Sequence, residues 1–467
     1  MRRLALLLQV LFIVSLAAGF TNVYPKLKNI PLRDEDDAGL PLFLTPLIES
    51  GKIDEARNKA LVQHKEMYEV SSYAGYLTVN KNYNSNMFFW FFPAVNSPMT
   101  APVVLWLQGG PGATSLFGLF MENGPFVVTS NKTLAMRKYS WNFSHNLLYI
   151  DNPVGTGFSF TDDDKGYAVN ETDVGRDVHT ALVQFFKLFP ELQSNDFYVT
   201  GESYGGKYVP AVSHAIKDYN IKAKTKINLK GLAIGNGLTD PENQLLYGDY
   251  LYQLGLLDAN GRELFHKYEE KGRKLIKEGK YIDAFNLFDE LLDSDLTNSP
   301  SLFKNLTGFD YYFNYLHTQD TNDSDYMVEW LQRADIRKAI HVGNCTFHVE
   351  AKEVEEHLKA DVMQSLAVLI ADLTQHYRVL LYNGQLDIIV AYPLTENYMQ
   401  KLKWAGAEKY KTAKRKKWFV GNELAGYSKT VDNFTEVLVR NAGHMVPSDQ
   451  PKWAFDLITR FTHNKRF

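Results

Sequence analysis

Short apolar runs recur along the chain and are separated by turn residues. Several of these runs are almost continuously apolar, which is typical of strands buried on both faces of a mostly parallel sheet. Seven runs have the length and the β-branched or aromatic content of strands: 87–92, 103–107, 147–150, 197–200, 232–234, 379–382 and 436–439. These runs predict the central sheet of the protein.

Helical patterns lie between several of the runs. Val174, Val178 and Ala181 recur at helical spacing within 171–189, and a second helix is predicted over 207–217. The alternation of strands with helices indicates an α/β architecture, in which helices cover both faces of the mostly parallel sheet.

The alternation of strands and helices stops between about 240 and 332, where apolar residues follow helical spacing with charged residues between them. We expect a helical insertion that caps the strand ends, where open α/β sheets place their sites. The predicted organisation is a signal peptide (1–19), an N-terminal extension or propeptide (20–70), the first part of the core (71–239), the helical cap insertion (240–332) and the second part of the core (333–467).

The N-terminus has the features of a secretory signal peptide. Arg2 and Arg3 precede the apolar stretch 4–16 and the small residues 17–19, with cleavage expected before Phe20. A membrane anchor is the alternative, but the apolar stretch is short for a transmembrane helix. N-x-S/T sequons agree with a secretory route to the cell exterior or to a lysosome or endosome. Glycosylation is expected among Asn131, Asn142, Asn170, Asn305, Asn322, Asn344 and Asn433.

Composition narrows the class of protein further. The 467 residues are 45% hydrophobic, as in globular chains, and 50 basic against 54 acidic side chains do not suggest a nucleic-acid binder. Cys345 is the only cysteine, so no intramolecular disulfide can form, and we expect a buried or half-buried structural thiol. The sequence has no H-E-x-x-H, no complete dinucleotide turn and no phosphate-binding loop. It therefore predicts neither a metal nor a cofactor.

The strongest chemical signal is a G-x-S-x-G motif at 201–205, GESYG. A predicted strand precedes it and a predicted helix follows it. On such a turn the serine hydroxyl projects away from the backbone, and the glycines keep the turn free of clashes. The bare pattern also arises by chance. Its context favours Ser203 as a nucleophile.

A serine nucleophile needs a base, and the base needs a partner that orients it. His444 lies on a loop after the run at 436–439, and Asp387 lies just after the run at 379–382. The alternatives are a surface histidine and a turn or helix N-cap aspartate. The order Ser203, Asp387, His444 is the order of an α/β-hydrolase triad.

The oxyanion that forms in acyl transfer needs backbone N–H donors. One is expected from Tyr204, the residue after the nucleophile. Another is expected from the glycine-rich turn 109–112, which directly follows the run at 103–107. A plain tight turn is the alternative, but three glycines and a proline after a buried strand favour close approach of a ligand to the backbone.

Together these motifs resemble those of the serine carboxypeptidases, which have the α/β-hydrolase fold, and within them the vitellogenic-like branch. The matching blocks run in family order from about residue 70: WLQGGPG (106–112), ENGP (122–125), DNPVGTGFSF (151–160), GESYGGKYVP (201–210), NG-x-x-D (383–387) and GHMVPSDQP (443–451). The resemblance implies a triad of Ser203, Asp387 and His444, oxyanion donors at Gly110 and Tyr204, and a group that holds the substrate's C-terminal carboxylate, formed by Gln108, Gly109, Glu122 and Glu202.

The sequence departs from the family pattern at two positions. Gln108 stands where asparagine is usual, which keeps the amide donor but adds a methylene, and Ala113 stands where cysteine is usual. Two glutamates can bind a substrate carboxylate only if protons are shared among the three groups, which favours acidic pH. His444 must be neutral to act as a base, which opposes very low pH. We therefore expect a mildly acidic optimum.

The chain is expected to be a serine-type carboxypeptidase that acts on peptide or protein C-termini. Two other functions are an acyltransferase on the same scaffold and a non-catalytic binding or protective role. The retained glutamates favour peptide substrates, and the complete set of catalytic parts disfavours the non-catalytic role. A homodimer is compatible with the sequence, which offers no argument for it.

Overall fold

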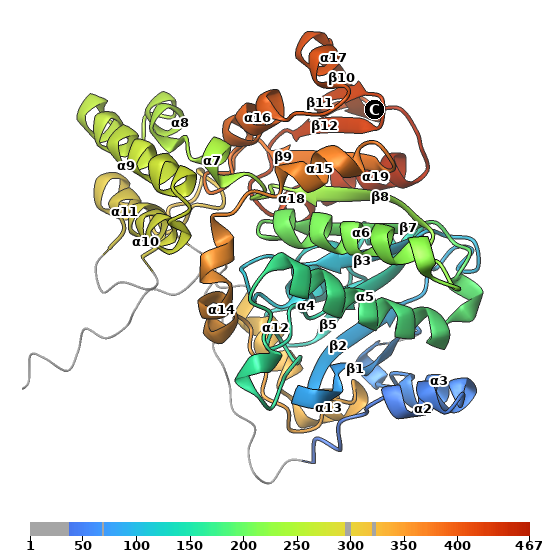
Figure 1. The fold of residues 1–467 in the computed structure, drawn as a ribbon. Coiled ribbons are helices and arrows are strands. Elements are labelled where there is room, and N and C mark those ends of the chain that lie inside the picture. Colours follow the sequence, from blue (N-terminus) through green and yellow to red (C-terminus); the bar gives the residue numbers. More distant parts are fainter. Residues whose placement is uncertain (1–36, 68–69, 295–299, 320–323) are drawn as a thin grey trace, which may run out of the picture.

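A ten-stranded sheet runs through the described part of the chain (Figure 1). The structure is a computed structural model that describes residues 37–67, 70–294, 300–319 and 324–467, so the predicted signal peptide lies outside it. Six neighbouring strands are parallel, in the order β6 (Asn146–Ile150), β3 (Val103–Leu107), β7 (Phe197–Glu202), β8 (Leu229–Gly235), β9 (Arg378–Gly384) and β12 (Phe434–Val439). The predicted mostly parallel sheet is confirmed.

Antiparallel strands extend the sheet at both edges. They are β2 (Ser85–Phe92) and β1 (Tyr73–Asn80) beside β6, and β11 (Glu423–Val431) and β10 (Lys416–Val420) beside β12. A separate hairpin pairs β4 (Phe126–Val128) with β5 (Leu134–Met136). The sequence analysis missed β1, β4, β5, β10 and β11. None of these strands is buried along its whole length. β4 and β5 are only three residues long, and β1, β10 and β11 contain glycine or polar residues that break the apolar run.

Two apolar layers bury the parallel strands, one on each face of the sheet. Along β3, Val103, Leu105 and Leu107 pack into one layer, and Val104 and Trp106 pack into the other. Helices α5 (Glu171–Leu188) and α6 (Gly205–Lys222) cover the first layer, and α12 (Ser324–Leu331) and α19 (Pro451–Thr462) cover the second. Helices therefore lie on both faces, as predicted.

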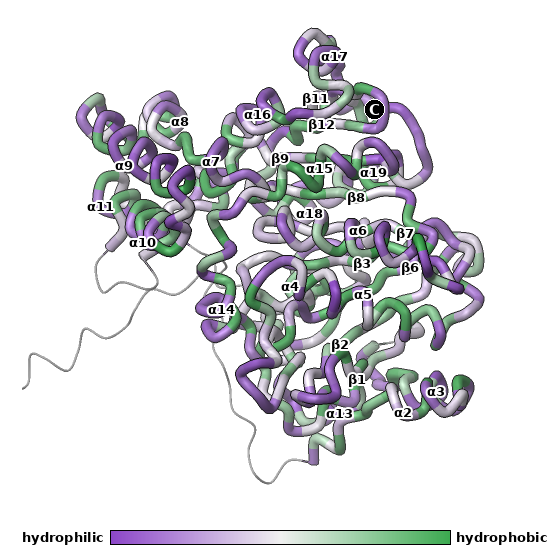
Figure 2. The backbone as a smooth tube through the Cα atoms, viewed as in Figure 1, coloured by the Kyte–Doolittle hydropathy of each residue, from purple (hydrophilic) through white to green (hydrophobic). Residues whose placement is uncertain are grey.

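A group of helices between 240 and 332 projects from one side of the sheet (Figure 1): α8 (Tyr247–Gln253), α9 (Ala259–Lys277), α10 (Tyr281–Leu292) and α11 (Leu302–Thr307). Phe265 of α9 and Leu291 of α10 are fully buried, so the group has an apolar interior. Much of α9 is hydrophilic (Figure 2). Further helices are α4 (Ser115–Phe117), α7 (Pro241–Gln244), α13 (Ala334–Ala339), α14 (Lys352–Val362), α15 (Ala367–Leu373), α16 (Tyr392–Lys401), α17 (Ala407–Thr412) and α18 (Val446–Asp449). None of the described helices is long and apolar enough to span a bilayer.

The described part of the N-terminal segment packs on the core. Its helices α2 (Thr45–Glu49) and α3 (Ile53–Ala60) lie against β1 and α5. Leu44 and Ala56 are fully buried, and the Leu44 N–H donates to Tyr76 O at 2.9 Å. Residues 37–67 therefore bury apolar surface against the core.

Candidate active site

Ser203 lies in the sharp turn between β7 and α6. Its φ of +60° is in the left-handed region, which non-glycine residues rarely adopt. The Ser203 N–H donates to Gly235 O at 3.1 Å, and the Ser203 carbonyl accepts from the Gly206 N–H at 2.8 Å. A Cβ on Gly201 would lie 2.5 Å from Leu107 O, so the turn needs glycine there. The strained turn is thus held by backbone hydrogen bonds to β8 and to the start of α6.

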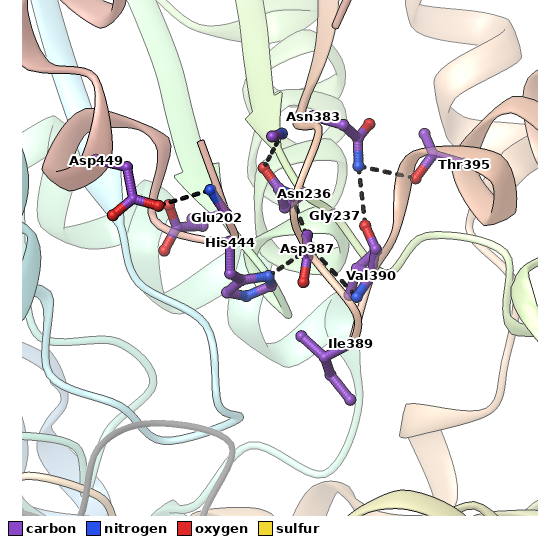
Figure 3. Close-up of polar contacts among 12 residues, drawn as sticks. Glu202, Asn236, Gly237, Asn383, Asp387, Ile389, Val390, Thr395, His444 and Asp449 are labelled. Atoms are coloured by element: carbon purple, nitrogen blue, oxygen red, sulfur yellow. Dashed lines mark hydrogen bonds and ion pairs between the residues drawn. The ribbon is translucent and has the colours of Figure 1, made fainter. Parts of the chain in front are cut away.

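His444 and Asp387 form a hydrogen-bonded pair with both side chains fully buried (Figure 3). His444 Nδ1 lies 2.8 Å from Asp387 Oδ2. The same oxygen accepts from Asn236 Nδ2 at 2.7 Å and from the Val390 N–H at 3.3 Å. Asp387 follows β9 and His444 follows β12, and these strands are parallel neighbours, so both side chains arrive at one edge. A carboxylate at Nδ1 favours a proton there, which makes Nε2 the basic nitrogen.

Asn236 is a site residue that the sequence analysis missed. It directly follows β8, just as Asp387 follows β9. Its Oδ1 accepts from the Gly384 N–H at 3.1 Å, so the amide is held at both ends. The position of a polar residue directly after a buried strand was the available signal.

The loop that carries His444 is held by contacts from two other segments. Asp449 accepts hydrogen bonds from the Gly443 N–H at 2.6 Å and from Asn314 Nδ2 at 3.1 Å. Phe313 O accepts from the His444 N–H at 2.7 Å, and the two rings lie 5.1 Å apart between centroids. Burial raises the pKa of Asp449, and the nearby Asp387 charge raises it further. These contacts fix the backbone on both sides of the imidazole.

Two tyrosines of α8 hold the loop after β9. The Tyr250 hydroxyl donates to Asp387 O at 2.7 Å, and the Tyr247 hydroxyl donates to Ile389 O at 2.7 Å. No sequence pattern indicated these roles, because both contacts join segments that are far apart in the chain. The helical group between 240 and 332 is thereby tied to the segment that carries Asp387.

One cavity brings together Ser203, Gly110 and Tyr204. Gly110 has a φ of +104°, and a Cβ there would lie 2.7 Å from Ala113 N, so this turn also needs glycine. Tyr204 is the N-cap of α6, where the helix dipole favours negative charge. The other lining residues come mainly from α10, α14 and the loop after β9: Pro111, Leu238, Phe285, Phe288, Asp289, Asp293, Glu355, Val362, Ile389 and Val390.

Gln108 connects Glu122 and Glu202 in a second, buried group. Its Nε2 donates to Oε1 of each glutamate at 3.1 Å. Its Oε1 accepts from Trp106 Nε1 at 2.6 Å, and since the indole is only a donor, this bond fixes which end of the amide faces the carboxyl groups. These side chains are at most 1% exposed. The glutamine amide therefore reaches both glutamates.

Burial raises the pKa of both glutamates. It raises the pKa of Glu122 to about 7, against the opposing effect of hydrogen bonds with Glu202 and Gln108. Burial and the charge of Glu122 raise the pKa of Glu202 well above its usual value. Two carboxyl groups this close do not ionise together readily, so the pair retains a proton at neutral pH.

The glutamate pair and the His444–Asp387 pair influence each other. His444 lowers the pKa of Glu122, and Asp387 raises the pKa of Glu202. Gly109, which is buried, joins Gln108 to Gly110, and Glu202 directly precedes Ser203. The predicted residues thus form two groups, one around the cavity and one around Gln108. The chain joins these groups directly at 108–110 and at 202–203.

The predicted glycosylation sites differ in exposure. Asn142 is 1% exposed and its Nδ2 is buried, so the folded chain has no room for a glycan there. Asn170 is half-buried at the N-cap of α5, and Asn322 lies outside the described residues. Four are exposed: Asn131, Asn305, Asn344 and Asn433. Within the described ranges, no three side chains of His, Cys, Asp or Glu converge as a metal site requires.

Comparison with known proteins identifies the family of the chain. The family model described as serine carboxypeptidase matches residues 63–464. The chain is 82% identical to the venom serine carboxypeptidase of Apis mellifera, over 99% of each chain. It is 50% identical to the probable serine carboxypeptidase CPVL of Homo sapiens, over 96% of this chain and 94% of that protein. The vitellogenic carboxypeptidase of Aedes aegypti is 49% identical, over 96% of this chain and 95% of that one.

Among solved structures, the prohormone-processing carboxypeptidase Kex1Δp of Saccharomyces cerevisiae superposes with a TM-score of 0.74. It is 23% identical and covers 87% of this chain and 96% of its own, a likeness that supports the α/β-hydrolase fold. With a family model that spans most of its length, the chain belongs to the serine carboxypeptidase family.

Proposed function

We propose that this serine carboxypeptidase uses Ser203 as nucleophile, His444 as general base and Asp387 as the acid that orients the base. The observation that carries the proposal is the buried His444–Asp387 hydrogen bond of 2.8 Å. It lies next to the cavity that Ser203 lines, because Val390 both donates to Asp387 and lines that cavity. This arrangement supplies the base and its partner beside a strained serine.

The reaction proceeds through an acyl-enzyme. Ser203 Oγ attacks the carbonyl carbon of the last peptide bond while its proton passes to His444 Nε2. The tetrahedral oxyanion accepts hydrogen bonds from the N–H groups of Gly110 and Tyr204. The C–N bond then breaks as His444 gives the proton to the leaving amine. Water repeats the steps on the ester and releases Ser203.

The group around Gln108 selects substrates that end in a free carboxylate. Gln108, Gly109, Glu122 and Glu202 would face that carboxylate, with a glutamate proton donated to it. Because the pKa of Glu122 is raised to about 7, the pair loses a proton as pH rises through neutrality and then repels the substrate. Peptide binding is therefore strongest at mildly acidic pH.

The surroundings of the site support further assignments. Helices α8 to α11 of the segment 240–332 act as a cap, since Phe285 and Phe288 of α10 line the Ser203 cavity. Helix α12 of the same segment packs on the sheet instead. The basic and apolar N-terminus and the exposed sequons support a secretory protein that acts outside the cell or in a lysosome or endosome on peptide C-termini. One relative bears the name of a venom protein, which agrees with secretion.

An N-blocked dipeptide, offered as the free acid and as the amide near pH 5, tests the proposal. The free acid should be cleaved at least about a hundredfold faster than the amide, since only the acid engages the glutamate pair. A fluorophosphonate should label the wild type and not Ser203→Ala. Equal cleavage of acid and amide would contradict carboxylate selection. Absence of both cleavage and labelling would contradict the catalytic role.

A further inference from the structure

A fully buried lysine lies one helical turn beyond Ser203. The Lys207 ammonium donates to Asp361 O at 2.7 Å and also to Gln364 O, and it lies 3.6 Å from the Asp361 carboxylate. Burying such a pair is costly, and fully buried lysines are rare. The catalytic steps described above use neither residue, so the pair needs another explanation.

Asp361 also contacts the side chain of the residue proposed as an oxyanion donor. The Tyr204 hydroxyl donates to Asp361 Oδ2 at 3.4 Å. The Lys207 ammonium lies 5.7 Å from the centre of the Tyr204 ring, within the range of a cation–π contact. Tyr204 is only 2% exposed. Asp361 therefore holds the start of α6 through the side chains of Tyr204 and Lys207.

The far side of this contact is the wall of the substrate cavity. Asp361 lies at the end of α14, and the next residue, Val362, lines the cavity with Ser203. Glu171, at the first position of α5, is 4% exposed, and burial together with the Asp361 charge raises its pKa well above the usual value. The Lys207–Asp361 ion pair of 3.6 Å is the direct charge contact within this cluster. The cluster thus fastens the nucleophile turn to the cavity wall.

We propose that Lys207 and Asp361 are positioning residues for the oxyanion site. By holding the Tyr204 side chain, they fix the direction of the Tyr204 N–H. The inference rests on the proposed function, because it takes that N–H as an oxyanion donor. An oxyanion contact is made only in the transition state, so losing it lowers kcat and leaves KM nearly unchanged. Complete removal of one donor costs roughly 100- to 1,000-fold in kcat, so a misdirected donor should cost roughly 10- to 100-fold.

The test begins with Lys207→Met, which keeps the chain length and removes the charge. Lys207→Met leaves the Asp361 carboxylate buried without its ion-pair partner. A Lys207→Met/Asp361→Asn double variant therefore removes both charges together. Both variants should lose roughly 10- to 100-fold in kcat, with KM within about twofold. Lys217→Met is the matched control, since Lys217 lies on the same helix and pairs with Asp372 away from the cavity. Its kcat should equal that of the wild type.

A second readout isolates the oxyanion. An N-blocked peptide aldehyde forms a tetrahedral adduct with serine, whereas the corresponding alcohol makes the other contacts without an oxyanion. Lys207→Met should weaken aldehyde binding by about the factor lost in kcat and leave alcohol binding unchanged. In a Tyr204→Phe background the effect of Lys207→Met should shrink, because the hydroxyl link to Asp361 is already gone.

The outcomes separate the two proposals. If the wild type cleaves the free-acid dipeptide and the variants lose only thermal stability, with the aldehyde-to-alcohol ratio unchanged, the positioning role is refuted and the proposed function stands. Full additivity with Tyr204→Phe also refutes it. A wild type that neither cleaves the dipeptide nor prefers the aldehyde refutes the proposed function, and the positioning role with it.

Discussion

Two buried pairs of ionisable groups lie near each other in this protein and differ in their partners. His444 is paired with a carboxylate that accepts two further hydrogen bonds, from Asn236 and Val390. Glu122 is paired with a second acid, Glu202, and a neutral amide bridges them. All four side chains of the pairs are at most 1% exposed. Burial alone therefore does not distinguish the pairs.

The partner decides what each pair can do. A carboxylate beside an imidazole holds one proton at a fixed nitrogen, which suits a base that must act in one direction. Two acids side by side exchange protons with the solution as pH changes, because burial and mutual repulsion raise their pKa values. In the proposed function, the first pair supplies chemistry and the second makes recognition depend on pH.

The largest effect should follow from changing the partner of His444. Asp387→Asn keeps the shape but can donate to Nδ1, which favours the wrong imidazole tautomer. We expect kcat to fall by about 10,000-fold with little change in KM, measured on an N-blocked dipeptide acid. A loss of less than about tenfold would show that Asp387 does not orient the base.

Stability should depend on pH through the second pair. The pKa of Glu122 is raised from 4.5 to about 7, so the folded protein binds a proton more tightly than the unfolded chain. The contribution of Glu122 to the free energy of unfolding is fully present below about pH 4.5 and is lost as pH rises through about 7. This contribution is roughly 3 kcal/mol, at 1.36 kcal/mol per pKa unit. Glu122→Gln should match the wild type at pH 4.5 and exceed it in thermal stability at pH 8. If the stability of Glu122→Gln and of the wild type changed with pH in the same way, the Glu122–Glu202 pair would not be the source of the pH dependence.

The bridging amide should matter for binding more than for chemistry. Gln108→Leu removes the donor to both glutamates and leaves Trp106 Nε1 without its acceptor. We expect KM for free-acid substrates to rise roughly tenfold, with kcat within about threefold, since a hydrogen bond to a charged group contributes about 1.5–3 kcal/mol. Gln108→Asn, the residue usual in the family, is the control that keeps the amide. A fall in kcat at constant KM would place Gln108 with the catalytic pair.

The smallest effect concerns the link between α8 and the catalytic loop. Tyr250→Phe removes one hydrogen bond to Asp387 O and keeps the ring. A hydrogen bond of about 1 kcal/mol corresponds to a loss of about fivefold in kcat. An unchanged kcat would show that Asp387 is oriented by Asn236 and Val390 without the helix.

The sequence predicted the His444–Asp387 pair better than the residues around it. Asp387 and His444 each follow a buried strand, and parallel strands deliver their ends to one edge, so position along the chain favoured both residues. Asn236 obeys the same rule and could have been found. Tyr250 contacts Asp387, and Asp449 contacts Asn314, across segments that are distant in the chain, which no local pattern records.

Only the resemblance to the serine carboxypeptidases indicated the Glu122–Glu202 pair. Glu122 lies in a π-helical turn, Gly118–Asn123, and Glu202 lies at the end of β7, so no spacing joins them. Their proximity arises from the fold and so does the raised pKa of each. The edge strands were missed for a similar reason, since only part of each is buried and its apolar run is broken.

The central claim is that the Glu122–Glu202 pair supplies a proton to the substrate's terminal carboxylate. Calorimetry of an N-blocked dipeptide acid binding to Ser203→Ala at pH 7.5, in buffers of different ionisation enthalpy, measures proton uptake directly. We expect uptake approaching about one proton per peptide, because binding a third carboxylate raises the pKa of the pair further. Binding of the dipeptide amide should be accompanied by no proton uptake. Binding of the free acid without proton uptake would contradict the claim.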